Sequence, residues 1–173
     1  MSPLENYRKS KNEAFRAELE SPLTADQRRE FKGLQYYPEN PALKLTVSID
    51  EYPEQKIVLM QTSTGSVKEY VQYGQFTFDV NGQAATLQVY QDLERNYYFL
   101  PFVDATSPEE TYGAGRYLDL EPAPDGKFVV DFNYAYNPYC AYNDNWTCPI
   151  PPKENRISVR IEAGEKNFKA ADH

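Results

Sequence analysis

Residues 76–89 read Phe-Thr-Phe-Asp-Val-Asn-Gly-Gln-Ala-Ala-Thr-Leu-Gln-Val. Apolar and polar residues alternate on both sides of the Asn-Gly dipeptide, which favours a two-residue hairpin turn. Such a turn pairs Phe78 with Ala85 and Phe76 with Leu87, so that apolar side chains meet on one face of the two strands. The stretch therefore predicts an antiparallel β-hairpin with a single consistent register.

Further segments of strand length flank this hairpin on both sides. We expect them at residues 43–50, 56–61, 67–73, 97–103, 116–120, 127–133 and 156–163. About eight short strands separated by Gly- and Pro-rich turns are typical of an all-β domain. The predicted fold is mainly β with N-terminal helices, as a small antiparallel β-barrel or a strongly rolled sheet.

The N-terminal residues have a helical rather than an alternating pattern. Ser2 and Glu5 frame a helix start with a capping box, and Thr24 begins a second, shorter one. Apolar residues in the first segment recur at helical spacing, which indicates an amphipathic helix. We expect residues 1–33 to form a helical segment packed on the barrel or roll of residues 36–166, within one domain covering residues 1–173.

The charge balance excludes some classes of partner. The chain has 18 Lys and Arg against 26 Asp and Glu, a net charge of -8, without a basic cluster. Nucleic acids and anionic membranes are bound mainly through Lys and Arg, so neither is an expected partner. No apolar segment is long enough to span a bilayer, and the first residues lack the features of a secretory signal. A cytoplasmic location is therefore expected.

Histidine chemistry is excluded by composition. The single histidine is His173, the last residue. A Ser-His-Asp or Cys-His hydrolase is therefore excluded on one chain, and we expect neither a metal site nor a cofactor. Any reaction would depend on carboxylates, tyrosines, arginine, lysine or cysteine.

The two cysteines, Cys140 and Cys148, lie close together in a segment rich in Tyr, Asn and Pro. Three states remain open for them: buried free thiols, a disulfide, or a metal-binding or catalytic thiol. A cytoplasmic location favours reduced thiols. A zinc site would need further ligands, because zinc takes four.

Arg116 is the leading candidate for ligand binding. It shares its strand face with Leu118 and Leu120, so the guanidinium points inward if the leucines do. A buried arginine needs an anionic partner. That partner is either the carboxylate or phosphate of a ligand, or a carboxylate of the fold itself, from Asp104, Glu110 or Asp131.

Other polar side chains in the same half of the chain complete a candidate site. For ligand binding the candidates are Arg116, Tyr112, Tyr117, Asn133, Asn137 and Cys140. For general acid–base catalysis they are Asp104, Glu110, Asp131 and Tyr136. Carboxylates at loop starts also cap turns, which is the structural alternative. The aromatic rings of Tyr136, Tyr139, Tyr142 and Trp146 could stack on a flat ligand or plug one end of the barrel.

Long motifs in this half of the chain resemble one family. They are residues 102–106 with 110–118, residues 131–143, residues 148–155 and the closing residues 161–166. Together they are similar to the domain-of-unknown-function 1684 family of bacteria and archaea, and the N-terminal helix also fits. The resemblance covers nearly the whole chain. It implies where a site lies without implying a reaction.

Three functions remain in view. The leading hypothesis is a binding module that holds a small polar or anionic molecule near Arg116, under the loop that runs from Tyr134 to Pro152. The second is a histidine-independent hydrolase or lyase that uses carboxylates. The third is a structural or interaction protein without a ligand. The sequence leaves the oligomeric state open.

Overall fold

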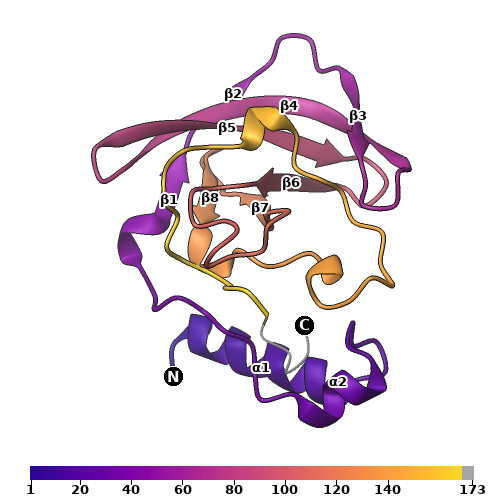
Figure 1. The fold of residues 1–173 in the computed structure, drawn as a ribbon. Coiled ribbons are helices and arrows are strands. Elements are labelled where there is room, and N and C mark those ends of the chain that lie inside the picture. Colours follow the sequence, from indigo (N-terminus) through magenta and orange to yellow (C-terminus); the bar gives the residue numbers. More distant parts are fainter. Residues whose placement is uncertain (169–173) are drawn as a thin grey trace.

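An antiparallel sheet curled into a half-barrel dominates the computed structural model, which describes residues 1–168 (Figure 1). Its strands are β1 (Lys44–Val47), β2 (Asp50–Glu51), β3 (Ile57–Gln61), β4 (Val67–Val80), β5 (Gln83–Asp92), β6 (Tyr97–Phe102), β7 (Arg116–Pro122) and β8 (Phe128–Asp131). They are ordered β1-β8-β7-β6-β5-β4-β2, and β3 also pairs with β4. The predicted mainly β fold with a rolled antiparallel sheet is confirmed.

The β4–β5 hairpin has the predicted register. Phe78 lies opposite Ala85 and Phe76 opposite Leu87. Asn81 and Gly82 have φ values of 52° and 83°, the left-handed conformation that a tight two-residue hairpin turn requires. The Asn-Gly dipeptide therefore fixes the pairing of the two longest strands.

Strand β4 is continuous where two separate strands were predicted. It contains a β-bulge, because the register with β5 shifts between Gln72 and Gly74. Gly74 is required there: a Cβ atom on it would lie 2.4 Å from the carbonyl oxygen of Asp50 in the neighbouring strand. The extra residue of a bulge moves the following side chains to the opposite face of the sheet.

The sheet has two different apolar faces, and the bulge places Phe76 on one of them and Tyr70 on the other. On the core face, eighteen buried residues from the strands and from the C-terminal segment form the main hydrophobic cluster, which includes Phe76, Leu87, Leu100 and Leu118. On the opposite face, a smaller cluster comprises Met60, Tyr70, Tyr90, Phe99 and Tyr117. We call this second surface the aromatic face.

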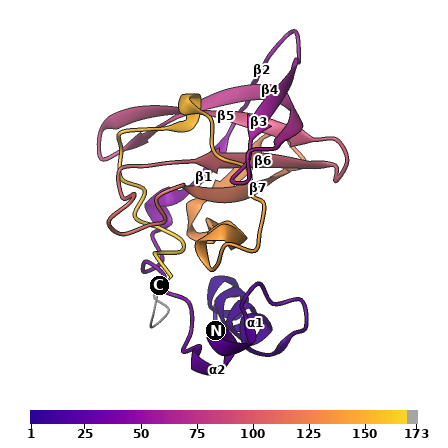
Figure 2. The same cartoon turned by 45° about the vertical axis from the view of Figure 1, so that its right-hand side comes forward.

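The N-terminal helices lie beneath the sheet (Figures 1 and 2). Helix α1 (Pro3–Ala17) is capped by the hydroxyl of Ser2, and α2 (Ala25–Glu30) has the complete capping box predicted at Thr24. Phe15 of α1 packs with Leu34 and Tyr142, which attaches the helix to the segment after β8. Among residues 1–168, no helix combines the length and apolarity needed to cross a membrane.

Four single-turn 3-10 helices complete the described elements: η1 (Pro41–Leu43), η2 (Phe132–Tyr134), η3 (Tyr139–Ala141) and η4 (Lys153–Asn155). The first one corrects the strand predicted at residues 43–50. The side chain of Asn40 accepts a hydrogen bond from the Ala42 N–H, which stabilises the turn through Leu43. Strand β1 begins only after it, and β2 pairs with β4 at the other end of the sheet.

The strand predicted at residues 156–163 is wrong. The segment is extended and buries apolar side chains on the core face, as its alternation suggested. Its carbonyl groups, however, bind the guanidinium of Arg116: Ile161 and Ala163 both accept from it. Near its start the segment also meets the chain after β6: the Ile157 N–H donates to the Val103 carbonyl and the Ala105 N–H donates to the Val159 carbonyl, but they form only an isolated bridge.

Candidate functional site

Arg116 lies at the start of β7, on the core face with Leu118 and Leu120, as its spacing predicted. Its side chain is completely buried. One Nη2 hydrogen bond goes to the Ile161 carbonyl at 2.9 Å, and Nη2 also lies 3.3 Å from Oδ1 of Asp104. Nη1 donates to the carbonyls of Ala163 and Glu165. Both terminal nitrogens therefore have partners inside the fold.

Asp104, the anionic partner, is equally enclosed. Its Oδ2 accepts from the Thr106 hydroxyl at 2.8 Å and from the Ile161 N–H at 2.7 Å. The Thr106 hydroxyl in turn meets that of Thr111 at 2.8 Å. Burial lowers the pKa of Arg116, and the carboxylate of Asp104 opposes this shift. These contacts favour the internal ion pair as the role of Arg116, and ligand binding by it stays a prediction.

The other carboxylates predicted for catalysis each have separate partners. Glu110 accepts from the hydroxyl of Tyr37 at 2.6 Å and pairs with Arg160 at 2.5 Å. Asp131 accepts from the backbone and side-chain nitrogens of Asn133, at 3.0 and 2.8 Å. Within residues 1–168, neither carboxylate makes a hydrogen bond or ion pair with Asp104, so the structure does not bring the predicted acids together into one site.

Asn133 and Tyr112 also make contacts within the fold. The side chain of Asn133 accepts from the Asn40 N–H at 2.8 Å and donates to the Asn40 carbonyl at 3.0 Å. The hydroxyl of Tyr112 lies 3.4 Å from the carbonyl of Cys140. Both residues hold loops against the sheet, and a ligand-binding role for either stays a prediction.

A second buried ion pair joins helix α1 to the C-terminal segment. Lys11 and Glu165 lie 2.5 Å apart, and the Glu165 side chain is almost completely buried. The same carboxylate accepts from the Tyr142 hydroxyl at 2.7 Å and from the Asn137 N–H at 3.3 Å. Burial opposes the charge of Lys11, but Glu165 outweighs it and raises the lysine pKa. The sequence analysis did not single out this pair.

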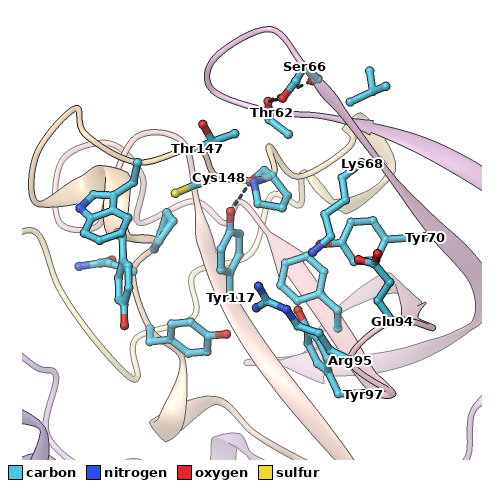
Figure 3. A pocket seen from close by; sticks show the side chains of 18 residues that line it. Thr62, Ser66, Lys68, Tyr70, Glu94, Arg95, Tyr97, Tyr117, Thr147 and Cys148 are labelled. Carbon is cyan, nitrogen blue, oxygen red and sulfur yellow. Dashed lines mark hydrogen bonds between the residues drawn. The ribbon is translucent and has the colours of Figure 1, made fainter. Parts of the chain in front are cut away.

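The aromatic face carries the candidate site, a cavity of about 590 Å³ that we call the aromatic pocket (Figure 3). Strands β4, β6 and β7 form its floor, and the segment of residues 136–149 forms its rim. Its aromatic lining comprises Tyr70, Tyr97, Phe99, Tyr117, Tyr136, Tyr139 and Trp146, and its charged residues are Lys68, Glu94 and Arg95. Tyr117, Tyr136 and Asn137 are the predicted site residues that line it.

Two hydroxyl groups of the pocket already donate hydrogen bonds within the protein. Tyr117 donates to the carbonyl of Pro149, which joins the floor to the rim. Tyr136 donates to Asp119 at 2.9 Å. Burial raises the pKa of both tyrosines, and it raises that of Tyr97 to about 12. All three hydroxyls are therefore neutral at physiological pH, and those of Tyr117 and Tyr136, whose protons are already donated, can still accept a hydrogen bond.

The positive charges of the pocket come from β4 and from the β5–β6 turn. Lys68 Nζ lies 3.1 Å from Asp92 Oδ2, in an ion pair without hydrogen-bond geometry. Arg95 is exposed, and Figure 3 shows its guanidinium directed toward the centre of the pocket. Within the described residues, Arg95 makes no ion pair. Of the two cations in the pocket, Lys68 is paired with Asp92 and Arg95 is free to meet an anionic group.

The two cysteines meet at the rim. Their sulfur atoms are 2.7 Å apart, both are free thiols, and Cys148 lines the pocket. Cys140, the predicted ligand-binding cysteine, is not among the lining residues. In the part of the chain that the structure describes, no three His, Cys, Asp or Glu side chains are grouped in a way that could hold a metal ion.

Sequence reasoning missed Lys68, Tyr70, Arg95 and Tyr97. These residues are distant in the chain from the loop of residues 134–152, where the sequence predicted a site. Tyr70 has the same parity as the core residue Phe76, so a regular strand would place both on one face. The signal that could have found the pocket is Gly74, because a glycine inside a strand pattern indicates a bulge.

Comparisons with known proteins agree with the resemblance in the sequence. Residues 29–166 match the family described as Protein of unknown function (DUF1684). A solution NMR structure of an uncharacterized protein of Haloarcula marismortui superposes with a TM-score of 0.70 at 32% sequence identity. The match covers 94% of this chain and 91% of that one. No curated protein matches. The chain therefore belongs to the DUF1684 family.

Proposed function

We propose that the protein binds a small planar molecule with an acidic group in the aromatic pocket. The observation that carries the proposal is Arg95, an unpaired guanidinium directed into a cavity with seven aromatic residues in its lining. The proposal keeps the small polar or anionic ligand expected under the loop from Tyr134 to Pro152. It moves the anchoring cation from Arg116 to Arg95.

The size and lining of the pocket suit such a ligand. A volume of about 590 Å³ lies within the range of small-molecule sites, roughly 300–1,000 Å³. Tyr139 and Trp146 pack edge to face, with ring centroids 5.1 Å apart, and both rings line the rim of the pocket. Rings of this kind stack on flat ligands with little loss of side-chain entropy. The aromatic lining therefore favours a planar ligand.

The charges of the pocket favour a ligand with an acidic group. Asp92 is occupied, because its Oδ1 accepts from the backbone N–H groups of Glu94 and Arg95 and its other oxygen faces Lys68. The same contacts fix the turn that carries Arg95. A guanidinium held on a fixed turn suits a carboxylate or phosphate oxygen pair, which it binds with two parallel hydrogen bonds.

The alternatives receive less support. For a histidine-independent hydrolase or lyase, Asp104, Glu110 and Asp131 would have to act together, and each has separate partners. The purely structural alternative describes the network around Arg116 well. It does not account for an open pocket in which an arginine has no partner.

The test uses 8-anilinonaphthalene-1-sulfonate, an anionic dye with a planar naphthalene ring system, as the probe. We expect saturable binding to the native protein. Replacing Arg95→Gln should raise the dissociation constant roughly tenfold, because a charge-assisted hydrogen bond contributes about 1.5–3 kcal/mol. The matched control is Arg29→Gln, an exposed arginine of α2 outside the pocket, which should leave the dissociation constant unchanged.

Urea unfolding of each variant separates loss of binding from loss of fold. Equal dye affinity in the wild type and Arg95→Gln would contradict the proposal. Native mass spectrometry of freshly purified protein extends the test to the natural ligand. A mass excess in the native spectrum that disappears on denaturation, and is reduced in Arg95→Gln, would identify the molecule bound.

A further inference from the structure

We propose that Cys140 and Cys148 are a redox-active pair, which a small-molecule disulfide such as oxidised glutathione converts reversibly into an intramolecular disulfide. The two sulfur atoms already lie 2.7 Å apart as thiols. A disulfide bond has a length of about 2.05 Å, so bond formation needs sulfur movement of less than about 1 Å. The inference does not depend on whether the pocket takes a ligand.

The surrounding backbone holds the two thiols in contact. Ser63, in the turn between β3 and β4, donates its N–H to the Cys148 carbonyl at 2.9 Å. Its hydroxyl accepts from the Cys148 N–H at 3.0 Å and lies 3.3 Å from the sulfur of Cys140. One serine therefore contacts both cysteines, and the segment is attached at both ends to the sheet.

The two thiols differ in accessibility, which sets the order of reaction. Cys140 is partly exposed, whereas Cys148 is buried. Burial, followed by the hydrogen bond with Cys140, raises the pKa of the Cys148 thiol to about 12. Thiolates are the attacking species in thiol–disulfide exchange. Cys140 is therefore the residue that reacts first with a disulfide from solution.

The reaction is a two-step exchange in which electrons and protons balance. The Cys140 thiol loses a proton, and its sulfur attacks glutathione disulfide, forming a mixed disulfide and releasing one glutathione thiolate. The Cys148 thiol then loses its proton and attacks the Cys140 sulfur, releasing the second glutathione. The protein loses two hydrogens, and one glutathione disulfide becomes two glutathione thiols. Excess reduced glutathione reverses both steps.

Oxidation would act on the rim of the aromatic pocket. The segment between the two cysteines carries Trp146 and Thr147, which line the pocket, and Cys148 lies beside Thr147 at its edge (Figure 3). In the reduced form the Cys140 thiol donates to the Trp146 carbonyl at 3.0 Å. A disulfide removes this donor but closes the segment covalently. The oxidised rim is therefore held by a bond where the reduced rim is held by hydrogen bonds.

Intact mass after incubation with glutathione buffers tests the reaction. We expect oxidised buffer to remove two hydrogens from the wild type and reduced buffer to restore them. In Cys148→Ser the exchange should stop at the mixed disulfide, so one glutathione remains attached to Cys140. In Cys140→Ser, adduct formation should be at least tenfold slower. Thiols that stay unmodified, or a glutathione that stays on the wild type, would overturn the proposal.

Trp146 reports on the rim, because it is the only tryptophan in the chain. In the oxidised wild type we expect weaker quenching of its fluorescence by acrylamide and a melting temperature higher by roughly 5 °C. The double variant Cys140→Ser, Cys148→Ser should show neither change with oxidised buffer. Identical quenching in the oxidised and reduced wild type would overturn the assigned effect on the rim.

Discussion

Arg116 and Arg95 show what the two faces of one sheet do with the same side chain. Arg116, on the core face, is fully buried, and its terminal nitrogens bind three backbone carbonyls and Asp104. Arg95, at the edge of the aromatic face, is exposed and makes no ion pair within residues 1–168. A buried cation whose terminal nitrogens are bound within the fold stabilises that fold, whereas an unpaired one at a cavity can bind a ligand.

The comparison of Arg116 with Arg95 also shows that a prominent sequence motif and a candidate binding site need not coincide. The motif around Arg116 predicted a ligand site because it combines an arginine with nearby acids and glycines at an apolar strand. Its contacts hold the C-terminal segment against the core face. The aromatic pocket has no comparable motif. It is assembled from three strands, two turns and the segment of residues 136–149, which lie far apart in the sequence.

The largest expected effect is the loss of stability on replacing Arg116→Met. The change leaves the Asp104 carboxylate buried without its counter-charge and removes the donors to two carbonyls of the extended segment. Breaking a buried ion pair from one side costs about 3–5 kcal/mol of the free energy of unfolding. Urea denaturation at pH 7 measures it.

Two further variants test the contrast between the buried Arg116 and the exposed Arg95. Arg95→Met should change the free energy of unfolding by less than about 0.5 kcal/mol, because the side chain is exposed and unpaired. The double variant Arg116→Met, Asp104→Asn should be more stable than Arg116→Met alone, since it removes the uncompensated charge. An Arg116→Met protein as stable as Arg95→Met would show that the buried pair does not hold the segment.

Most of the sheet could be predicted from the sequence because its signals are local. Alternation over residues 76–89 fixes the hairpin, and the Asn-Gly turn fixes its register. Residues 156–163 alternate in the same way, yet they form no strand. Alternation reports which side chains are buried, but the backbone partners here are the Arg116 guanidinium and an isolated parallel bridge to Val103, both distant in the chain.

An intermediate effect on the free energy of unfolding is expected at Gly74, the glycine at the bulge of β4. In Gly74→Ala, the new Cβ would lie 2.4 Å from the Asp50 carbonyl oxygen and 2.7 Å from Cγ2 of Ile49. Overpacking of this kind costs typically 1–3 kcal/mol, which urea denaturation would detect. Because β2 or the bulge must shift, we also expect weaker dye binding in the aromatic pocket.

Gly113→Ala is the matched control for this substitution. Its new Cβ would meet only the side chain of Pro108, at an ordinary contact distance of 3.5 Å. We expect wild-type stability and dye affinity for this variant. If Gly74→Ala behaved in the same way, the bulge would tolerate a side chain, and the close approach of Asp50 would not require glycine there.

The candidate site could be predicted only in part, again for a physical reason. The loop from Tyr134 to Pro152 does reach the pocket, and Tyr117, Tyr136 and Asn137 do line it. Strand parity places Tyr70 on the wrong face unless the bulge is known. Arg95 sits in an exposed turn, where an arginine in the sequence looks like an ordinary solvated residue.

The smallest expected effect concerns Asp92, which keeps Lys68 paired and the turn of Arg95 in place. Burial raises the pKa of its carboxyl, but the Arg95 N–H and Lys68 outweigh this and lower it below the ordinary value. A carboxylate with a depressed folded-state pKa stabilises the protein above its unfolded pKa of about 3.9, and this contribution is lost as the pH falls through the folded value. In Asp92→Asn we expect a loss of about 1 kcal/mol at pH 7, modest because Lys68 is partly exposed.

The pH dependence distinguishes this electrostatic effect from a packing defect. The free energies of unfolding of the wild type and Asp92→Asn should approach each other as the pH falls below about 4 and converge below the lowered folded-state pKa, because the folded wild-type carboxyl is protonated only there. The control Asp79→Asn, on the exposed side of the β4–β5 hairpin, should follow the wild type throughout. A difference for Asp92→Asn that persists unchanged at low pH would mean that Asp92 acts through shape. Its charge would then not be what keeps Lys68 paired and leaves Arg95 as the free cation of the pocket.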